Sequence, residues 1–162
     1  MSWGSLPSWV LVSAVLAVAS GCAASTAALR YEEAKNNTQT VLAFEETVYN
    51  KHQVPEGFAH YVGAGYREHA ARLGEGREGA IRALSQLVHS YPGSRVTVQR
   101  TIAQGNLVAV HLIWNAQLPP DQGVARVDIY RLEDGRIVEH WDVAQEPLPI
   151  AALALGKAVA GG

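Results

Sequence analysis

Asp128 and His140 are the two residues of this chain best placed by type and spacing to do chemistry together. They lie in the segment 126–142, where two alternating runs are joined by Asp-Gly, a strong signal for a β-hairpin. Side chains repeat every two residues on one face of a strand, so a turn bulged at Gly135 would place Asp128 opposite His140. A tight two-residue turn would instead pair Asp128 with Trp141.

A carboxylate and an imidazole on an apolar surface can perform acid/base catalysis without a cofactor, and no cofactor is expected. Burial disfavours a charged carboxylate, which would raise the pKa of Asp128 and make it a better general base. A neighbouring histidine can relay the proton or donate to a developing oxyanion. The alternative is a structural carboxylate that accepts from a histidine or from Arg126. The further candidates are His111 and His69 for catalysis, and Tyr66, Trp114 and Tyr130 for ligand contacts.

Metal and nucleophilic chemistry are less well supported by the residue types. The three candidate histidines and Asp128 match no compact ligand motif, so no metal site is predicted. Cys22 is the only cysteine, and no serine stands in a Gly-x-Ser-x-Gly elbow. The folded domain therefore offers neither a thiolate nor a recognisable serine nucleophile.

The N-terminus indicates export. Residues 9–19 form an apolar run that is too short to span a bilayer but suits a signal-peptide core. The run leads into Ala-Ser-Gly-Cys ending at Cys22, which resembles the lipobox of bacterial lipoproteins. That resemblance implies removal of residues 1–21, lipidation of Cys22 and a membrane-anchored protein of the bacterial cell envelope. An ordinary cleaved signal peptide and a retained anchor are the alternatives.

Composition indicates a single globular domain behind this signal. The chain has 162 residues and a formal net charge of −2, with no basic stripe, so nucleic acid is not expected as a partner. Residues 22–36 are predicted to be a tether, 37–149 the domain and 150–162 a C-terminal tail.

Hydrophobic periodicity predicts helices first and strands after, which is an α+β pattern. The Asn-Asn-Thr run at 36–38 is predicted to cap the first helix rather than to carry a glycan. The expected helices cover residues 37–50, 55–62 and 77–90, and the expected strands cover 95–104, 107–117, 124–133 and 136–145.

Several motifs along residues 37–145 resemble the SnoaL-like polyketide cyclase family of the nuclear transport factor two-like superfamily. They are Tyr-Val-Gly at 61–63, Tyr-Arg-Glu-His at 66–69, the glycines 76 and 79, Val-Ala-Val-His at 108–111, and VDIYRLEDGRIVEHWDV at 127–143. The resemblance implies a cone-shaped fold, with three N-terminal helices packed on a curved antiparallel sheet around one deep pocket. It matches Asp128 to an acid/base aspartate of the cyclases.

The resemblance also implies a homodimer, because the outer sheet face is a recurrent dimer surface in relatives. Val127, Ile129 and Trp141 would lie on that face. One departure is His69-Ala70-Ala71, where the family often has His-Asn-Pro.

Three functions follow as hypotheses. The first is cofactor-free acid/base catalysis of the aldolase, isomerase, dehydratase or hydrolase type on a small apolar carbonyl compound. The second is a lipid-tethered protein that binds a small hydrophobic molecule without turning it over. The third is a dimeric interaction module. Export would separate the protein from cytoplasmic polyketide synthases, which argues against the cyclases' own substrates.

Overall fold

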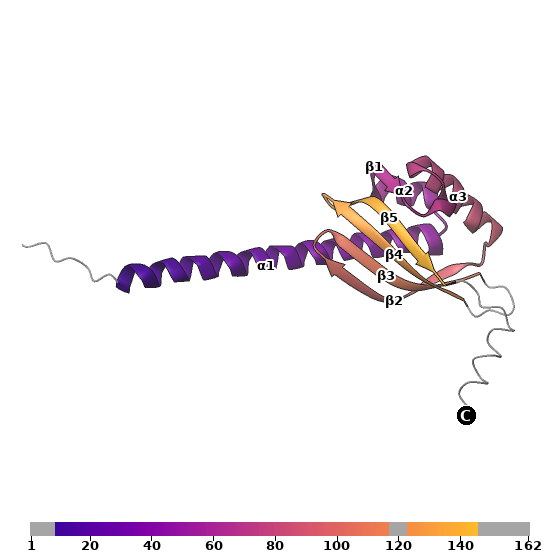
Figure 1. The fold of residues 1–162 in the computed structure, drawn as a ribbon. Coiled ribbons are helices and arrows are strands. Elements are labelled where there is room, and N and C mark those ends of the chain that lie inside the picture. Colours follow the sequence, from indigo (N-terminus) through magenta and orange to yellow (C-terminus); the bar gives the residue numbers. More distant parts are fainter. Residues whose placement is uncertain (1–8, 117–122, 146–162) are drawn as a thin grey trace, which may run out of the picture.

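The computed structural model describes residues 9–116 and 123–145, with the backbone alone for residues 9–24 and 71 (Figure 1). The helical elements are α1 (Trp9–Glu45), a π-helical turn η1 (Glu46–Asn50), α2 (Val54–Tyr61), a 3-10 turn η2 (Ala71–Leu73) and α3 (Gly76–Ser90). The strands are β1 (Val62–Glu68), β2 (Arg95–Gln104), β3 (Leu107–Asn115), β4 (Val124–Glu133) and β5 (Arg136–Ala144). The predicted tail at 150–162 lies outside the described residues.

The sheet has the order β1-β5-β4-β3-β2 and confirms the predicted α+β class. β2 to β5 form the expected antiparallel meander. The prediction of an entirely antiparallel sheet is wrong, however, because β1 joins the edge parallel to β5. The sequence gives β1 no alternating pattern, and its glycines indicated the end of a helix. At Gly63 an added Cβ would lie 3.2 Å from Val138, so this strand approaches β5 closely.

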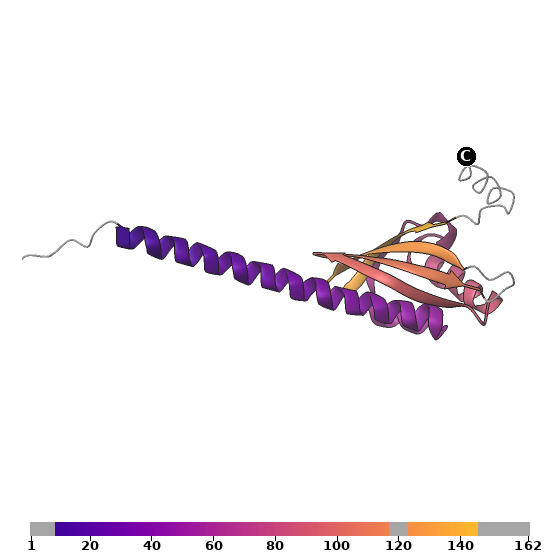
Figure 2. The ribbon, with the colours of Figure 1, turned by 90° about the horizontal axis from the view of Figure 1, so that it is seen from below.

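The predicted start of the first helix at residue 37 is also wrong. α1 runs without interruption from Trp9 to Glu45 and extends well beyond the sheet (Figure 2). The predicted tether therefore belongs to the same helix as the start of the domain. Asn37 is buried and donates from Nδ2 to the Gly105 carbonyl at 3.4 Å, so it links the helix to the β2–β3 turn rather than capping it.

The core lies between the helices and one face of the sheet. Val41, Phe44 and Val48, which lie on one face of α1 at i, i+3 and i+7, are all buried. The Phe44 ring packs edge-on against Phe58 at 5.4 Å and Tyr130 at 5.9 Å, which ties α1 to α2 and β4.

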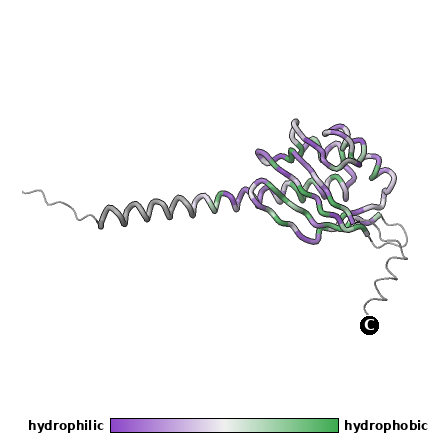
Figure 3. The backbone as a smooth tube through the Cα atoms, in the orientation of Figure 1, coloured by the Kyte–Doolittle hydropathy of each residue, from purple (hydrophilic) through white to green (hydrophobic). Residues whose placement is uncertain are grey.

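Hydrophobic and hydrophilic residues are interspersed along the strands (Figure 3), and burial alternates along β3 and β4. On β3, Val108, Val110 and Leu112 are fully buried, whereas Ala109 and His111 between them are only partly buried. One face of the sheet is therefore the inner, core-facing surface.

Where the structure describes side chains within the helices, no stretch is long and apolar enough to cross a membrane.

Candidate functional site

The β4–β5 hairpin sets which side chains face the interior. Asp134 (φ 48°) and Gly135 (φ 72°) form a tight two-residue turn with positive φ at both positions. The strands begin paired as Glu133 with Arg136 and Leu132 with Ile137. An irregularity between Leu132 and Arg131 then shifts the register by one residue.

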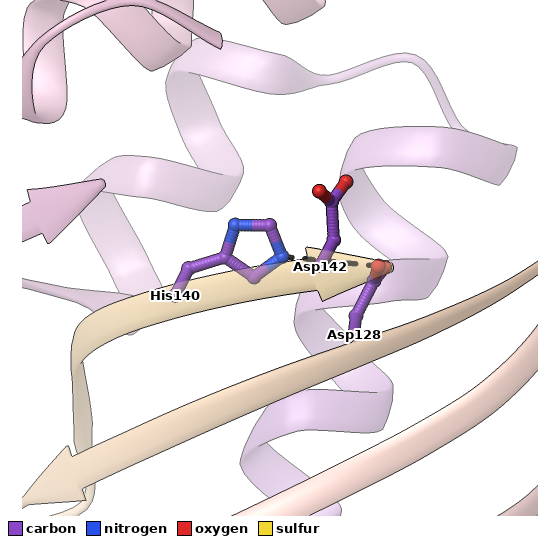
Figure 4. A group of neighbouring side chains, drawn as sticks. All are labelled: Asp128, His140 and Asp142. Atoms are coloured by element: carbon purple, nitrogen blue, oxygen red, sulfur yellow. Dashed lines mark ion pairs between the residues drawn. The ribbon is translucent and has the colours of Figure 1, made fainter. Parts of the chain in front are cut away.

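Both predicted pairings of Asp128 are therefore wrong in register. Tyr130 lies opposite His140, and Asp128 lies opposite Asp142. Asp128 and His140 nevertheless share the inner face as diagonal neighbours, with His140 Nε2 3.8 Å from Asp128 Oδ1 (Figure 4). The expected meeting of this carboxylate and imidazole is thus present, through a different pairing.

Five ionisable side chains form what we call the buried polar cluster: Glu45 of α1, Glu68 of β1, Arg126 and Asp128 of β4, and His140 of β5. Each is at most 7% exposed. Burying charged groups is costly unless they are paired, so the contacts within the cluster decide its chemistry.

Glu68 holds His140 in place. His140 Nδ1 lies 2.9 Å from Glu68 Oε1, and the same carboxylate accepts from the Tyr66 hydroxyl at 2.5 Å and from the Ala70 amide at 2.9 Å. The imidazole ring also stacks on Tyr130, with ring centroids 4.9 Å apart. These contacts fix the ring so that Nε2 points toward Asp128.

Arg126 is the main partner of Asp128. Its Nη2 donates to Asp128 Oδ2 at 2.6 Å, and its guanidinium lies 4.7 Å from the centre of the Tyr49 ring. Asp128 is therefore ion-paired through one oxygen, while its other oxygen faces His140.

The expectation of a raised pKa at Asp128 is wrong. Burial alone would raise it, but Arg126 and then His140 outweigh burial and lower the pKa of Asp128. Burial would likewise lower the pKa of His140, but the carboxylates of Asp128 and Glu68 raise it to about 9. At neutral pH the pair is therefore a carboxylate facing an imidazolium.

Glu45 behaves in the opposite way. Burial, followed by the negative charge of Asp128, raises the pKa of Glu45 to about 8, although Arg126 opposes this. The Tyr130 hydroxyl donates to Glu45 Oε1 at 2.5 Å. The Glu45 carboxyl is therefore neutral at pH 7 beside an ionised Asp128.

Four buried polar atoms of the cluster have no hydrogen-bond partner among the residues that the structure describes. They are Glu45 Oε2, Arg126 Nε, Asp128 Oδ1 and His140 Nε2. Leaving such atoms unpaired costs about 1–3 kcal/mol each, and native proteins keep few of them. When Glu45 is protonated, Asp128 Oδ1 is an acceptor and the other three atoms are donors. Donors of this kind can bind the oxygen of a carbonyl compound.

Asp142 lies beside this pair, and one ligand atom from each of Asp128, His140 and Asp142 fits within a 4.8 Å group (Figure 4). Arg72 forms a two-pronged ion pair with Asp142, and Arg126 donates to Asp128 through a single hydrogen bond. A cation would have to compete with both guanidinium groups and with the proton on His140. The charges therefore favour an ion-pair network over a metal site.

The structure does not bring His111 and His69 to Asp128, so their predicted place in the site is corrected. His111 lies opposite Val127, one residue out of phase with Asp128, and so faces the outer side of the sheet. The His69 ring stacks on Trp141 at 4.6 Å, and its Nε2 lies 3.9 Å from Glu139.

Two of the three residues predicted to contact a ligand lie at the buried polar cluster, and the third does not. Tyr66 and Tyr130 both hydrogen-bond carboxylates of the buried polar cluster. Trp114 packs against the core and lies edge-on to Tyr91 at 5.5 Å, near the end of β3.

Sequence reasoning missed Glu45 and Glu68 as site residues. Glu45 was detectable, because it stands four residues after Val41 and three before Val48, inside the apolar stripe of the helix. Glu68 gave no such signal, because its role depends on the parallel pairing of β1 with β5, where it lies opposite His140.

A surface cavity of about 580 Å³ lies at the other end of β5 from Asp142. It is lined by Val62, Gly63, Ala64, Arg77, Glu78 and Arg136, and includes no member of the buried polar cluster. The cluster itself is closed to solvent by the described residues, so a ligand reaches it only if some of them move.

The fold is shared with many solved structures at low sequence identity. IdmH, a proposed polyketide cyclase from Streptomyces antibioticus, is 20% identical with a TM-score of 0.60, over 73% of this chain and 98% of IdmH. A proposed SnoaL-like polyketide cyclase from Jannaschia is 21% identical with a TM-score of 0.59, over 80% of this chain and 95% of that one. An NTF2-like protein of unknown function from Mesorhizobium loti is 18% identical with a TM-score of 0.57, over 70% and 94%.

These similarities, with the helices on one face of a curved mixed sheet, define the nuclear transport factor two-like class of cone-shaped folds. Within that class, the model of the SnoaL-like polyketide cyclase family matches residues 39–148, and the chain belongs to this family. No curated protein matches the sequence significantly.

Proposed function

We propose that the buried polar cluster binds a small, largely apolar carbonyl compound and moves protons on it without a cofactor. The observation that carries the proposal is the pair His140 Nε2 and Asp128 Oδ1. These atoms are buried, face each other across 3.8 Å, and have no hydrogen-bond partner among the described residues. Buried polar atoms without a hydrogen bond are rare in native cores, and violations of this rule are expected at functional sites.

Each residue has a distinct role in this proposal. Asp128, ionised through Arg126, accepts a proton from the carbon next to the carbonyl group. His140, held as an imidazolium by Glu68, donates from Nε2 and stabilises negative charge that develops on the ligand. Tyr66 and Ala70 fix the Glu68 carboxylate and so fix the donor.

The lowered pKa of Asp128 also narrows the substrate class. A weakly basic carboxylate removes only an acidic C–H proton at a useful rate. The favoured ligand is therefore one whose C–H bond lies between two carbonyl groups, with an otherwise apolar body.

The Arg72–Asp142 pair is the proposed entrance. Asp142 is nearly buried (4% exposed side chain), while Arg72 on η2 is half-exposed (49%). Solvent screens the exposed Arg72 side of this pair, and rotation of the long arginine side chain would separate the two groups. Separation would uncover Asp142 and, next to it, the atoms of Asp128 and His140.

The test is proton exchange on a panel of alkyl-substituted 1,3-diketones in D₂O, followed by proton NMR. The wild-type protein should exchange the proton between the carbonyl groups faster than buffer does. Asp128→Asn and His140→Gln should each lower the exchange rate above buffer about tenfold or more. His111→Gln, a histidine on the other face of the same sheet, is the matched control and should exchange like wild type. Exchange no faster than buffer, or equal exchange by Asp128→Asn, would overturn the catalytic proposal.

Non-catalytic binding is the second candidate, and the closed, ion-paired state of Asp128 is the observation that favours it. In that case the same diketones should shift the His140 ring resonances without exchanging their protons. Shifts confined to His69 and His111 would contradict binding at the cluster.

We also propose that the protein is held at the cell envelope by a lipid on Cys22. Residues 22–36 lie within α1, so this segment would act as a helical spacer of about 20 Å rather than as a flexible tether.

A homodimer through the outer sheet face is proposed as well. Ile129 lies opposite Trp141 there, and Val143 is 69% exposed at the end of β5. Light scattering should give twice the chain mass for wild type and the single mass for Ile129→Asp. A monomeric wild type would remove this proposal.

A further inference from the structure

Glu45 occupies a position where a packed core calls for an apolar side chain. It lies on the buried face of α1, and it is 1% exposed. Its Oε1 accepts the Tyr130 hydroxyl at 2.5 Å, while its Oε2 is buried without a hydrogen-bond partner among the described residues. The carboxyl group is therefore held by Tyr130 through Oε1, while Oε2 is available for a hydrogen bond to a ligand.

The groups around Glu45 are those of the proposed site. Asp128, Arg126 and His140 all act on it electrostatically, and Tyr130, which binds it, stacks on His140. Tyr49, Tyr66 and Glu68 are the remaining titratable groups of this interior. Two carboxyl groups whose pKa values are pushed apart by their surroundings suit opposite roles in proton transfer. Here Asp128 is ionised and Glu45, raised to about 8, is protonated at neutral pH.

We propose that Glu45 is the general acid of this site, donating its carboxyl proton from Oε2 to the carbonyl oxygen of the ligand while Asp128 removes the proton from the adjacent carbon. This inference rests on the proposed function. The C–H electron pair forms the new C=C bond, the carbonyl π pair moves to oxygen, and that oxygen takes the Glu45 proton. Asp128 becomes neutral as Glu45 becomes a carboxylate, so the net charge of the cluster is unchanged.

The stabilisation of the group left behind after proton transfer is the physical reason for preferring Glu45 over the other donors. Arg126 does not give up a proton, because guanidinium stays charged in proteins. Loss of the proton from His140 would leave the buried Glu68 carboxylate beside a neutral ring, without the charge that it is paired with. A newly ionised Glu45 remains near Arg126 and keeps the Tyr130 hydrogen bond, so its charge is stabilised where it forms.

Glu45→Gln separates this role from a structural one. The amide keeps an acceptor for Tyr130 and a donor toward the ligand, so folding and binding should persist, but it has no proton to transfer. Glu46→Gln is the matched control, because Glu46 is the next residue of the chain, exposed and bonded to Asn50.

The first readout is the pH profile of diketone proton exchange. The wild-type rate should fall as pH rises through about 8, where Glu45 loses its proton. Glu45→Gln should lower the rate at least about tenfold at neutral pH and remove that fall, while Glu46→Gln should retain both. A Glu45→Gln protein with the wild-type rate and profile would overturn the inference even if Asp128 proves essential.

The second readout does not depend on catalysis. Infrared spectra of the full chain should contain a neutral carboxylic-acid band at pH 7 that is missing in Glu45→Gln and shifts when phenol, a planar and largely apolar compound with one oxygen, is added. No band, an unshifted band with the phenol bound, or no binding of the phenol would each contradict a donor at Oε2. If wild type exchanges no diketone protons but the band shifts, the proposed catalysis fails while Glu45 stands as a ligand-binding donor.

Discussion

At the scale of single residues, the protonation state of each group in the site follows from the charged groups that it contacts. Asp128 and His140 each sit in surroundings that would neutralise an isolated charge, yet each keeps its charge because an opposite charge lies nearby. Glu45 lacks a comparably close cationic partner and is neutral instead. All three groups are buried, but their contacts within a few ångströms leave Asp128 and His140 charged and Glu45 neutral.

Glu68→Gln should lower the pKa of His140 from about 9 toward its ordinary 6.5, because burial would then be opposed mainly by Asp128. A proton NMR titration of the His140 ring measures this. Glu133→Gln, an exposed carboxylate on the neighbouring strand, should leave the titration unchanged. An unaltered His140 titration in Glu68→Gln would mean that the Glu68 contact does not control the imidazole.

Arg126→Leu should cost roughly 3–5 kcal/mol of folding free energy, because it removes the main partner of the buried Asp128 charge. Adding Asp128→Leu should recover much of that loss, since an apolar pair no longer has a charge to compensate. Urea unfolding measures both, with Arg100→Leu on the exposed part of β2 as the control. If the double variant is no more stable than Arg126→Leu, the ion pair is not what destabilises the single variant.

At the scale of elements, the β4–β5 hairpin decides which residues enter the site. Its tight turn and one-residue shift together turn His140 inward beside Asp128. Without the shift Tyr130 would face Glu139, and His140 would point outward. A single irregularity in one strand therefore makes the difference between a site and a surface histidine.

Gly135→Ala should destabilise the protein by about 1–2 kcal/mol, because Gly135 has φ 72°, which alanine adopts only with strain. Thermal unfolding checks the value. Gly65→Ala on exposed β1, where an added Cβ has nothing within 4 Å, should change stability little. Equal effects from the two changes would argue against the strained turn.

At the scale of the whole molecule, the buried polar cluster makes stability depend on pH. Glu45 (ordinary value 4.5, raised to about 8) and His140 (6.5, raised to about 9) both bind protons more tightly when folded. Their contributions are present at low pH and are lost as pH rises through these windows. Asp128 and Glu68 have lowered pKa values, so their contributions are lost in acid.

The free energy of unfolding should therefore be greatest at about pH 4.5 and fall steadily toward pH 9. Thermal melts across this range measure it. Glu45→Gln should remove the part of the fall that begins near pH 4.5 and retain the part due to His140. A wild-type maximum at pH 8 or above would contradict the assigned protonation states.

Cys22→Ala should release the protein from membranes if Cys22 carries a lipid. Membrane fractionation of cells producing each form is the measurement, with Ser25→Ala as the control. Unchanged membrane association of Cys22→Ala would contradict the lipid anchor.

The sequence by itself determined the order of the helices and of strands β2 to β5 and most of their bounds, but not β1 or the start of α1. Alternation over β2 to β5 and the apolar stripe of Val41, Phe44 and Val48 are local patterns, and local patterns survive folding when burial and propensity agree. It left open whether Asp128 and His140 share a strand face, because that depends on the turn and on the register shift between β4 and β5.

Only the tertiary structure decided what this face contains. Glu68 reaches His140 because β1 pairs in parallel with β5, across 72 residues of chain, and Glu45 reaches Tyr130 from a helix 85 residues away. His111 lies outside the site because its position on β3 turns its side chain to the outer face of the sheet. His69 lies outside it because its ring stacks on Trp141. Long-range partners set both the charges and the pKa values of the site, because electrostatic interactions act through space rather than along the sequence.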